Sequence, residues 1–267
     1  MSMRFYDQIN WSAPWFDLVR PAAQQLIAAP DWRDRLNQLA QEHQLQNHLG
    51  MPLLFIPQEE LPEGAAYEAH ISATGKVPTR ENLHDFFNAL VWLNFPLIKR
   101  QLNALQAAQI AALGIGKSRG PARDAATIFD ENAALLVVEN SVKGDELIAA
   151  LRQHKWQSAF LTQRDKFNHC AKVWSFGHAL MEKLVNPYKA ITAHTWVVRV
   201  ESAHFTRSRD EGLREIDESV SDILKTLTLT TGDYTPLPVL GIPGWWLDQD
   251  ADFYADRDVF RPPRHKK

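Results

Sequence analysis

Apolar residues recur at helical spacing in one segment of this chain after another, and a proline or glycine closes most of these segments. The clearest stripe spans residues 83–91, where Thr79 is the expected N-cap, and Pro96 breaks it. A further helix is predicted to run to Leu113, with Gly114 just past its end. The regular placement of these helix-ending residues favours a mostly helical fold built from short and medium helices.

Further segments show the same apolar spacing and are also predicted to be helices: residues 15–29, 31–44, 144–155, 165–185 and 208–232. The last of them begins with a capping box, because Ser208 is followed three residues later by Glu211. The segment 165–185 is apolar on nearly every side, which is typical of a helix that is buried all round.

The predicted β-structure is minor. Residues 124–130 and 135–139 are apolar and β-prone with a turn-like segment between them, so we expect a β-hairpin there. Residues 51–56 and 192–200 are the other expected strands. The fold class is therefore α+β, mostly helical, with a small sheet that contains the hairpin.

The C-terminal part changes in composition. From Tyr234 onward the chain is rich in proline and aromatic residues, which predicts an irregular wrap rather than a long helix or a central strand. Residues 261–267 are expected to form a loose basic tail. Since no flexible linker interrupts residues 1–267, we expect a single α+β domain, with two lobes as the alternative.

Charge and cysteine content limit the functional classes. The net charge of −3, from 29 basic and 32 acidic residues, gives no argument for binding nucleic acid or an anionic membrane. Cys170 is the sole cysteine, so a reducing compartment is expected. The N-terminal residues lack an apolar signal segment, and no stretch is apolar enough to span a bilayer. These features predict a cytoplasmic protein and do not specify its oligomeric state.

Two local patterns imitate known binding loops and fail at defining positions. Residues 116–118 look like the end of a phosphate-binding loop. However, Ala111 stands where that motif has its first glycine, and Pro121 follows shortly after residues 116–118. Residues 248–252 look like the start of a calcium loop, but Phe253 replaces its glycine. A basic loop and an acidic turn are the better interpretations.

Chemically capable side chains stand beside core-forming residues in three separated segments. His84 lies one helical turn before Asn88, with Asp85 next to it. His178 lies one helical turn before Glu182 in the same way. A histidine and a carboxylate at this spacing can ligate one divalent metal, or can act as a base and its orienting group.

The third segment carries the remaining carboxylates. Asp124 and Asp130 are evenly spaced, so they would share one side of the first hairpin arm, and Glu131 follows. Three groups of candidates result. The candidate catalytic residues are His84, Asp85, Asp124, His178 and Glu182, the candidate metal ligands are Asp130, Glu131 and His178, and the candidate substrate-binding residues are Arg80, Asn88, Lys99, Arg123 and His194.

Each of these residues also has an ordinary structural explanation. His84 and Asp85 could cap or bridge neighbouring helices, the 130–132 segment suits a tight turn, and His178 could be a buried histidine paired with Glu182. Buried polar groups need partners, however, so this many near one core favours a cleft.

Four ordered blocks of sequence resemble one known family. They are FNALVWLNFP at 87–96, RDAATIFDEN at 123–132, FGHALMEK at 176–183 and PLPVLGIPGW at 236–245. Together they resemble the bacterial domain of unknown function 3025, over nearly the whole chain from about Trp11 to Pro262. The resemblance implies a bacterial cytosolic protein with a single full-length domain. It implies no activity and no catalytic residues.

Two classes of function follow. The first is an enzyme, of which a metal-assisted hydrolase acting on a small polar or anionic substrate is the leading form, with a divalent metal as the only cofactor considered. The alternative is a non-catalytic protein that binds a small ligand in the same pocket, or a protein partner through the C-terminal wrap. Partner binding predicts that Trp245 and Trp246 form one exposed patch.

Overall fold

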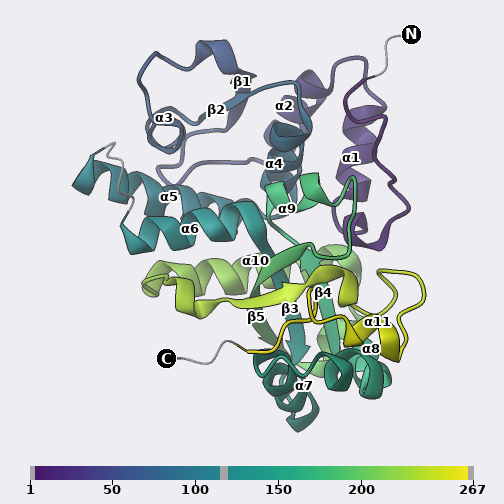
Figure 1. Ribbon diagram of the computed structural model, residues 1–267. Coiled ribbons are helices and arrows are strands. Elements are labelled where there is room, and N and C mark those ends of the chain that lie inside the picture. The colour runs from purple at the N-terminus through teal and green to yellow at the C-terminus, as the bar shows by residue number, and fades with distance from the viewer. Residues whose placement is uncertain (1–3, 115–119, 264–267) are drawn as a thin grey trace.

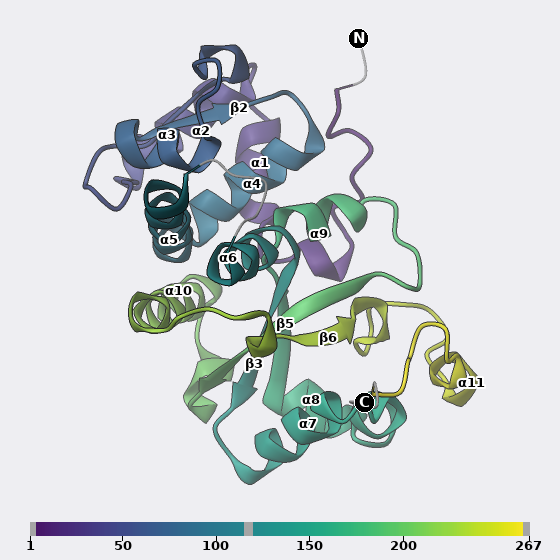
Figure 2. The same cartoon turned by 60° about the vertical axis from the view of Figure 1, so that its left-hand side comes forward.

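The computed structural model describes residues 4–114 and 120–263. Helices dominate, and the strands form one two-stranded and one four-stranded sheet among these residues, which confirms the mostly helical α+β class. Figures 1 and 2 show helices α1–α6 above the larger sheet and helices α7 and α8 below it. The imitation phosphate loop at 116–118 lies outside the described residues. No helix among the described residues is long and apolar enough to cross a membrane.

The N-terminal part packs two helices and a small sheet against the helical layer. Asp31 caps α2 by accepting hydrogen bonds from two main-chain N–H groups, as its position before an apolar stripe predicts. Strands β1 and β2 are parallel and are joined through α3. The elements are α1 (Arg20–Ile27), α2 (Trp32–Glu42), β1 (Leu54–Pro57), α3 (Tyr67–Thr74) and β2 (Lys76–Thr79).

Three consecutive helices form the layer that carries the candidate site: α4 (Leu83–Asn94), α5 (Pro96–Leu113) and α6 (Pro121–Asn132). Pro96 is the first residue of α5, and Gly114 ends that helix at a φ of 73°, as predicted. The predicted cap of α4 is wrong. Thr79 ends β2, and the side chain of Asn82 caps α4 through the N–H of Asp85 at 2.8 Å.

The four-stranded sheet has the order β4-β3-β5-β6. Strands β3 and β5 are parallel and central, while the edge strands β4 and β6 each pair antiparallel with their neighbours. Strand β3 is buried along nearly its whole length, as a strand covered on both faces is. The elements are β3 (Ala133–Glu139), α7 (Val142–Arg152), α8 (Arg164–Cys170), β4 (Ala171–Ser175), β5 (Thr192–Val200) and β6 (Thr235–Pro238).

The predicted hairpin is wrong, because residues 124–130 belong to α6. Pro121 provides the first residue of that helix, and Ala125, Ala126 and Phe129 then lie on its buried face. The alanines and the helical spacing outweigh the β-preference of Thr127 and Ile128. Strand β3 pairs with β4 and β5 instead of with the preceding segment.

The predicted helix over residues 165–185 is also wrong. This segment contains α8, then β4, then α9 (His178–Lys183). An apolar run that is buried on both sides does not distinguish a helix from a strand by its spacing. At the turn into α9, a Cβ atom added to Gly177 would lie 2.4 Å from the carbonyl oxygen of Glu131. Only glycine allows this contact, which holds the start of α9 against the end of α6.

The last part of the chain contains α10 (Arg209–Thr226) and α11 (Ala251–Ala255). The predicted capping box of α10 is confirmed, but the helix ends at Thr226 rather than near Gly232. Strand β6 is an edge strand, where its prolines are tolerated. Trp245 and Trp246 are half-buried and pack against the core, so they do not form the exposed patch that partner binding predicted. The main-chain oxygen of Arg261 accepts a hydrogen bond from Trp156, and residues 264–267 of the expected tail lie outside the described part.

Candidate functional site

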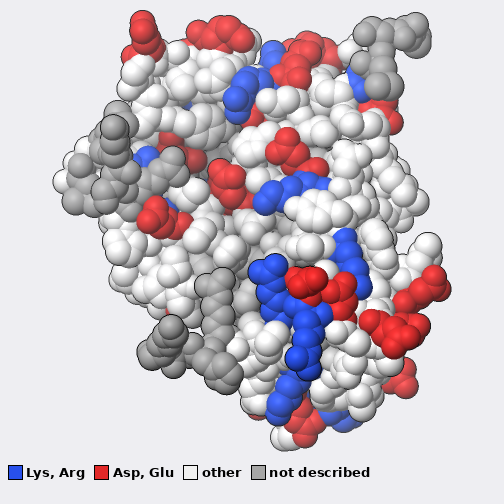
Figure 3. Space-filling model, viewed as in Figure 1, with Lys and Arg blue, Asp and Glu red and all other residues white. Residues whose placement is uncertain are grey.

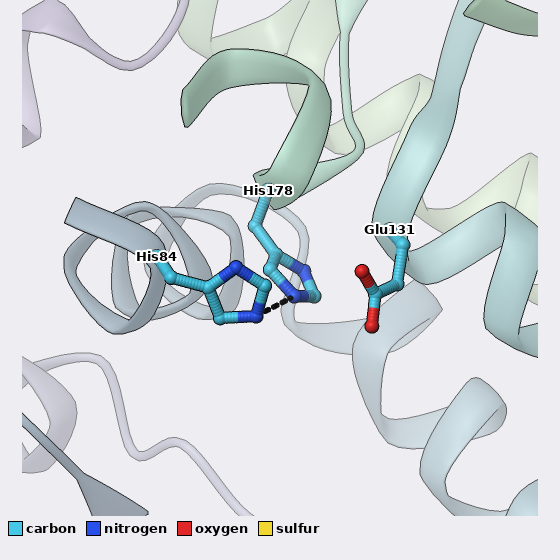
Figure 4. Close-up of side chains that lie close together, drawn as sticks. All are labelled: His84, Glu131 and His178. Atoms are coloured by element: carbon cyan, nitrogen blue, oxygen red, sulfur yellow. Dashed lines mark hydrogen bonds between the residues drawn. The ribbon is translucent and has the colours of Figure 1, made fainter. Parts of the chain in front are cut away.

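His84, His178 and Glu131 meet where α4, α9 and α6 converge (Figure 4). His84 lies in the first turn of α4, His178 begins α9, and Glu131 stands one residue before the end of α6. One potential ligand atom from each residue lies within 4.8 Å of the other two. His178 is buried, while His84 and Glu131 are half-buried. The site therefore joins a buried imidazole to two groups that solvent can reach.

The two histidine rings face each other through their Nε2 atoms, which are 3.1 Å apart. This distance suits an N–H···N hydrogen bond. It is also close to the separation of about 3.3 Å between two ligands of a tetrahedral ion with metal–nitrogen bonds of about 2.05 Å. The rings are nearly perpendicular, at 83°, so neither covers the other.

A carboxylate lies behind each ring, on the Nδ1 side. His84 Nδ1 is 2.9 Å from an oxygen of Glu182, and His178 Nδ1 is 3.9 Å from an oxygen of Asp130. A carboxylate in this position favours a proton on Nδ1 and leaves the Nε2 lone pair pointing away from it. If both rings adopt that tautomer, two lone pairs face each other at 3.1 Å, and a proton or a cation between them is required.

His178 is neutral at ordinary pH. Burial lowers the pKa of this histidine to about 4, and the positive charges of Lys99 and His84 act in the same direction, while Asp130 opposes them. A neutral imidazole has the free lone pair that a metal ligand or a proton acceptor needs. Its Nδ1 has no hydrogen-bond partner among the described residues, although Asp130 is near.

A layer of buried polar groups extends inward from His178. Lys99 Nζ lies 2.6 Å from Asp130 and 2.8 Å from Asn88, whose amide donates to the hydroxyl of Tyr67 at 3.0 Å. Burial alone would raise the pKa of Asp130, but Lys99 and His178 together hold it below its ordinary value. Asp130 therefore remains ionised and faces both the lysine and the histidine.

The residues Tyr67 and Glu68 of α3 complete this layer and were not predicted. Burial raises the pKa of Glu68, which accepts a hydrogen bond from Asn103 at 2.6 Å, and burial also raises the pKa of the Tyr67 hydroxyl. Both residues follow a stretch rich in proline, glycine and glutamate, which resembles a loop in the sequence. The sequence signal for α3 was limited to the short run of helix-forming residues after Ala66.

Arg80 and Asp85 are close to the site but bind each other. The guanidinium of Arg80 makes two hydrogen bonds to the carboxylate of Asp85, at 2.9 and 3.0 Å, and its main-chain N–H makes a third. Asp85 is buried, while the side chain of Arg80 is 55% exposed. Asp85 therefore anchors the start of α4, and Arg80 keeps an accessible face.

Three other predicted residues lie outside the three-residue cluster: Asp124, His194 and Arg123. Asp124 is exposed, because six helical residues place it about 120° around α6 from buried Asp130. It does not join the site. His194 on β5 is bound to the amide of Asn132 at 3.0 Å, and burial lowers its pKa. Arg123 is half-buried in the first turn of α6, and its charge acts on Glu68.

The family described as Protein of unknown function (DUF3025) matches residues 53–264. The chain belongs to this family. The match covers every residue of the His84–Glu131–His178 cluster and of the buried layer, and it leaves α1 and α2 outside. No curated protein and no solved structure is significantly similar to the chain.

Charged groups are mixed on the face that Figure 3 shows. Acidic and basic side chains lie beside one another there and do not form one broad field of a single sign. A wide basic surface is the usual mark of a nucleic-acid-binding face. The mixed charges on this face do not match that pattern.

Proposed function

We propose that the protein is a metal-dependent hydrolase acting on a small polar or anionic substrate, with the ion held by His84, His178 and Glu131. One observation carries the proposal: the two Nε2 atoms face each other at 3.1 Å while each ring has a carboxylate behind it. Two nitrogens and one carboxylate, with further positions open, form a ligand set that is common in catalytic zinc sites.

Each neighbouring residue has a role in this proposal. A bound divalent ion would supply Lewis acidity toward water or a substrate carbonyl or phosphoryl oxygen. Glu182, at hydrogen-bond distance from His84 Nδ1, holds that imidazole in the required tautomer and orientation, while the charge of Asp130, 3.9 Å from His178 Nδ1, favours the same tautomer in the second ring. Lys99 keeps Asp130 ionised, and the exposed face of Arg80 is the cation available to an anionic substrate.

A second candidate is a protein that binds the ion or a ligand without turnover. Hollows of about 600 and about 390 Å³ on the described surface are lined by other residues than His84, Glu131 and His178. Enzymes acting on small molecules usually place their catalytic groups in such a hollow. This observation favours binding without catalysis, so turnover has to be measured separately from metal binding.

Metal binding is tested by calorimetric titration of the purified chain with Zn²⁺ and Mn²⁺. We expect saturation at one ion per chain, and an affinity at least tenfold lower in each of His84→Asn, Glu131→Gln and His178→Asn. His169→Asn is the matched control, because His169 is exposed and bonds only the main-chain oxygen of Asp165. Equal affinity in all four variants would refute the metal site.

Turnover is tested with the metal-loaded protein on small phosphate esters and carboxylate esters. The hydrolase proposal predicts activity that chelation abolishes and that Glu131→Gln lowers, with the control variant unaffected. Tight metal binding without hydrolysis of any ester in either class would favour the second candidate.

A further inference from the structure

A hollow of about 600 Å³ lies between α1, α2, α10 and the junction of α4 with α5. Its volume falls within the range of small-molecule sites. The N-terminal part provides one wall, with Leu39 from α2 and Leu45 just after that helix, and these residues precede the part that the family match covers. Leu93 and Leu213 provide the opposite wall. The hollow therefore exists only where the N-terminal segment meets the rest of the chain.

Basic groups stand at the edge of this leucine-lined hollow. Arg209 and Arg214 both line it from α10 and are exposed. Arg209 is partly used by Asp210 and by the buried side chain of Asn94. Arg214 makes no ion pair with any described residue, so its guanidinium is available to a ligand.

The buried acid that lines the same hollow does not cancel these charges. Asp217 is 3% exposed and accepts hydrogen bonds from the N–H groups of Leu97 and Ile98, at 3.0 and 2.9 Å. Those groups begin α5, so the positive end of that helix already compensates the carboxylate. A ligand entering from solvent meets leucine side chains, the Arg209–Asp210 pair, and the guanidinium of Arg214, which has no ion-pair partner among the described residues.

We propose that this leucine-lined hollow binds a small amphipathic carboxylate, with its alkyl chain against the leucines and its carboxylate at Arg214 and Arg209. The site is distinct from the metal cluster, because His84 and Asn94 stand at opposite ends of α4, roughly 15 Å apart along its axis. Guanidinium groups bind carboxylates in a two-pronged geometry, and the leucines supply the apolar contact.

The probe for this proposal is hexanoate, titrated calorimetrically into the wild-type chain with 1-hexanol and acetate as comparisons. We expect saturable binding of hexanoate at one site, and binding at least tenfold weaker for the alcohol and for acetate. Arg214→Gln should weaken hexanoate about tenfold, since one charge-assisted contact is lost. Lys225→Gln on the same helix is the control, because Lys225 pairs with Asp222 outside the hollow, and it should bind as the wild type does.

Filling the hollow is an independent test. Ala22 lines it and is half-buried, so Ala22→Trp should abolish hexanoate binding while circular dichroism and Zn²⁺ affinity remain unchanged. His84→Asn should bind hexanoate normally, which separates this site from the proposed metal centre. Absence of saturable hexanoate binding, equal binding of 1-hexanol, or full binding by Arg214→Gln would each overturn the proposal.

Discussion

Replacing Lys99 with methionine tests whether Lys99 and Asp130 form a stabilising ion pair within the buried polar layer. Lys99 and Asp130 are both almost fully buried, with side chains 4% and 8% exposed and a separation of 2.6 Å. Removing the lysine charge leaves Asp130 in a dry site without its cation. Breaking a buried pair in this way costs about 3–5 kcal/mol. For a chain of this size, that corresponds to a fall in Tm of about 10 °C.

The loss of stability in Lys99→Met is expected to depend on pH. Lys99 and His178 hold the pKa of Asp130 below its ordinary value against the effect of burial. The pair therefore stabilises the wild type above the unfolded-state pKa, and this contribution is lost as pH falls through the folded-state value. In Lys99→Met, burial is no longer opposed by the lysine. The difference in stability between variant and wild type should shrink toward acid pH.

The assay is urea unfolding followed by tryptophan fluorescence at several pH values. Lys225→Met is the matched control, because it breaks the exposed pair with Asp222 and should cost less than about 1 kcal/mol. The double variant Lys99→Met with Asp130→Asn should regain most of the lost stability, since it removes the unpaired charge. A loss below about 1 kcal/mol in Lys99→Met, or one that does not depend on pH, would refute the ion-pair argument.

Two further predictions concern other parts of the structure. Burial raises the pKa of Asp217 to about 7, against the hydrogen bonds from Leu97 and Ile98. Stability should therefore fall as pH rises from about 4 to about 7, by up to about 4 kcal/mol, and Asp217→Asn should remove this slope in unfolding experiments. Gly177→Ala should lower Tm and weaken Zn²⁺ binding, because its Cβ would lie 2.4 Å from the carbonyl oxygen of Glu131. The control Gly232→Ala meets only an ordinary contact at 3.5 Å and should change neither.

Local signals predicted the parts of the fold that they control. Pro96 and Gly114 set the limits of α5, because proline suits the first position of a helix and glycine accepts the positive φ of 73° found just past its end. The capping box at Ser208 identified the start of α10. Residues 165–185 were misassigned for a different reason. Their apolar character reflects burial by distant segments, and burial alone does not specify the local backbone.

The three residues of the cluster were candidates in the sequence, but their pairing and the presence of Tyr67 and Glu68 in the buried layer were not predicted. His84, Glu131 and His178 were all expected. His178 and Glu182 lie on one helix as predicted, although that helix is the short α9 and not the predicted helix over residues 165–185. The partner of Glu182 is His84, however, not His178. Lys99 was expected to bind substrate, but it pairs with Asp130 inside the layer. Such pairings depend on how helices from different parts of the chain meet, and one sequence contains no signal for them.

The most direct test of the proposed metal site is an anomalous-difference map from crystals soaked in Zn²⁺. We predict one strong peak about 2.0–2.1 Å from the Nε2 atoms of His84 and His178, with an oxygen of Glu131 at a similar distance. Both Nδ1 atoms should keep their carboxylate neighbours. A map with no peak between the two rings, and with their Nε2 atoms still in direct contact, would contradict the proposal.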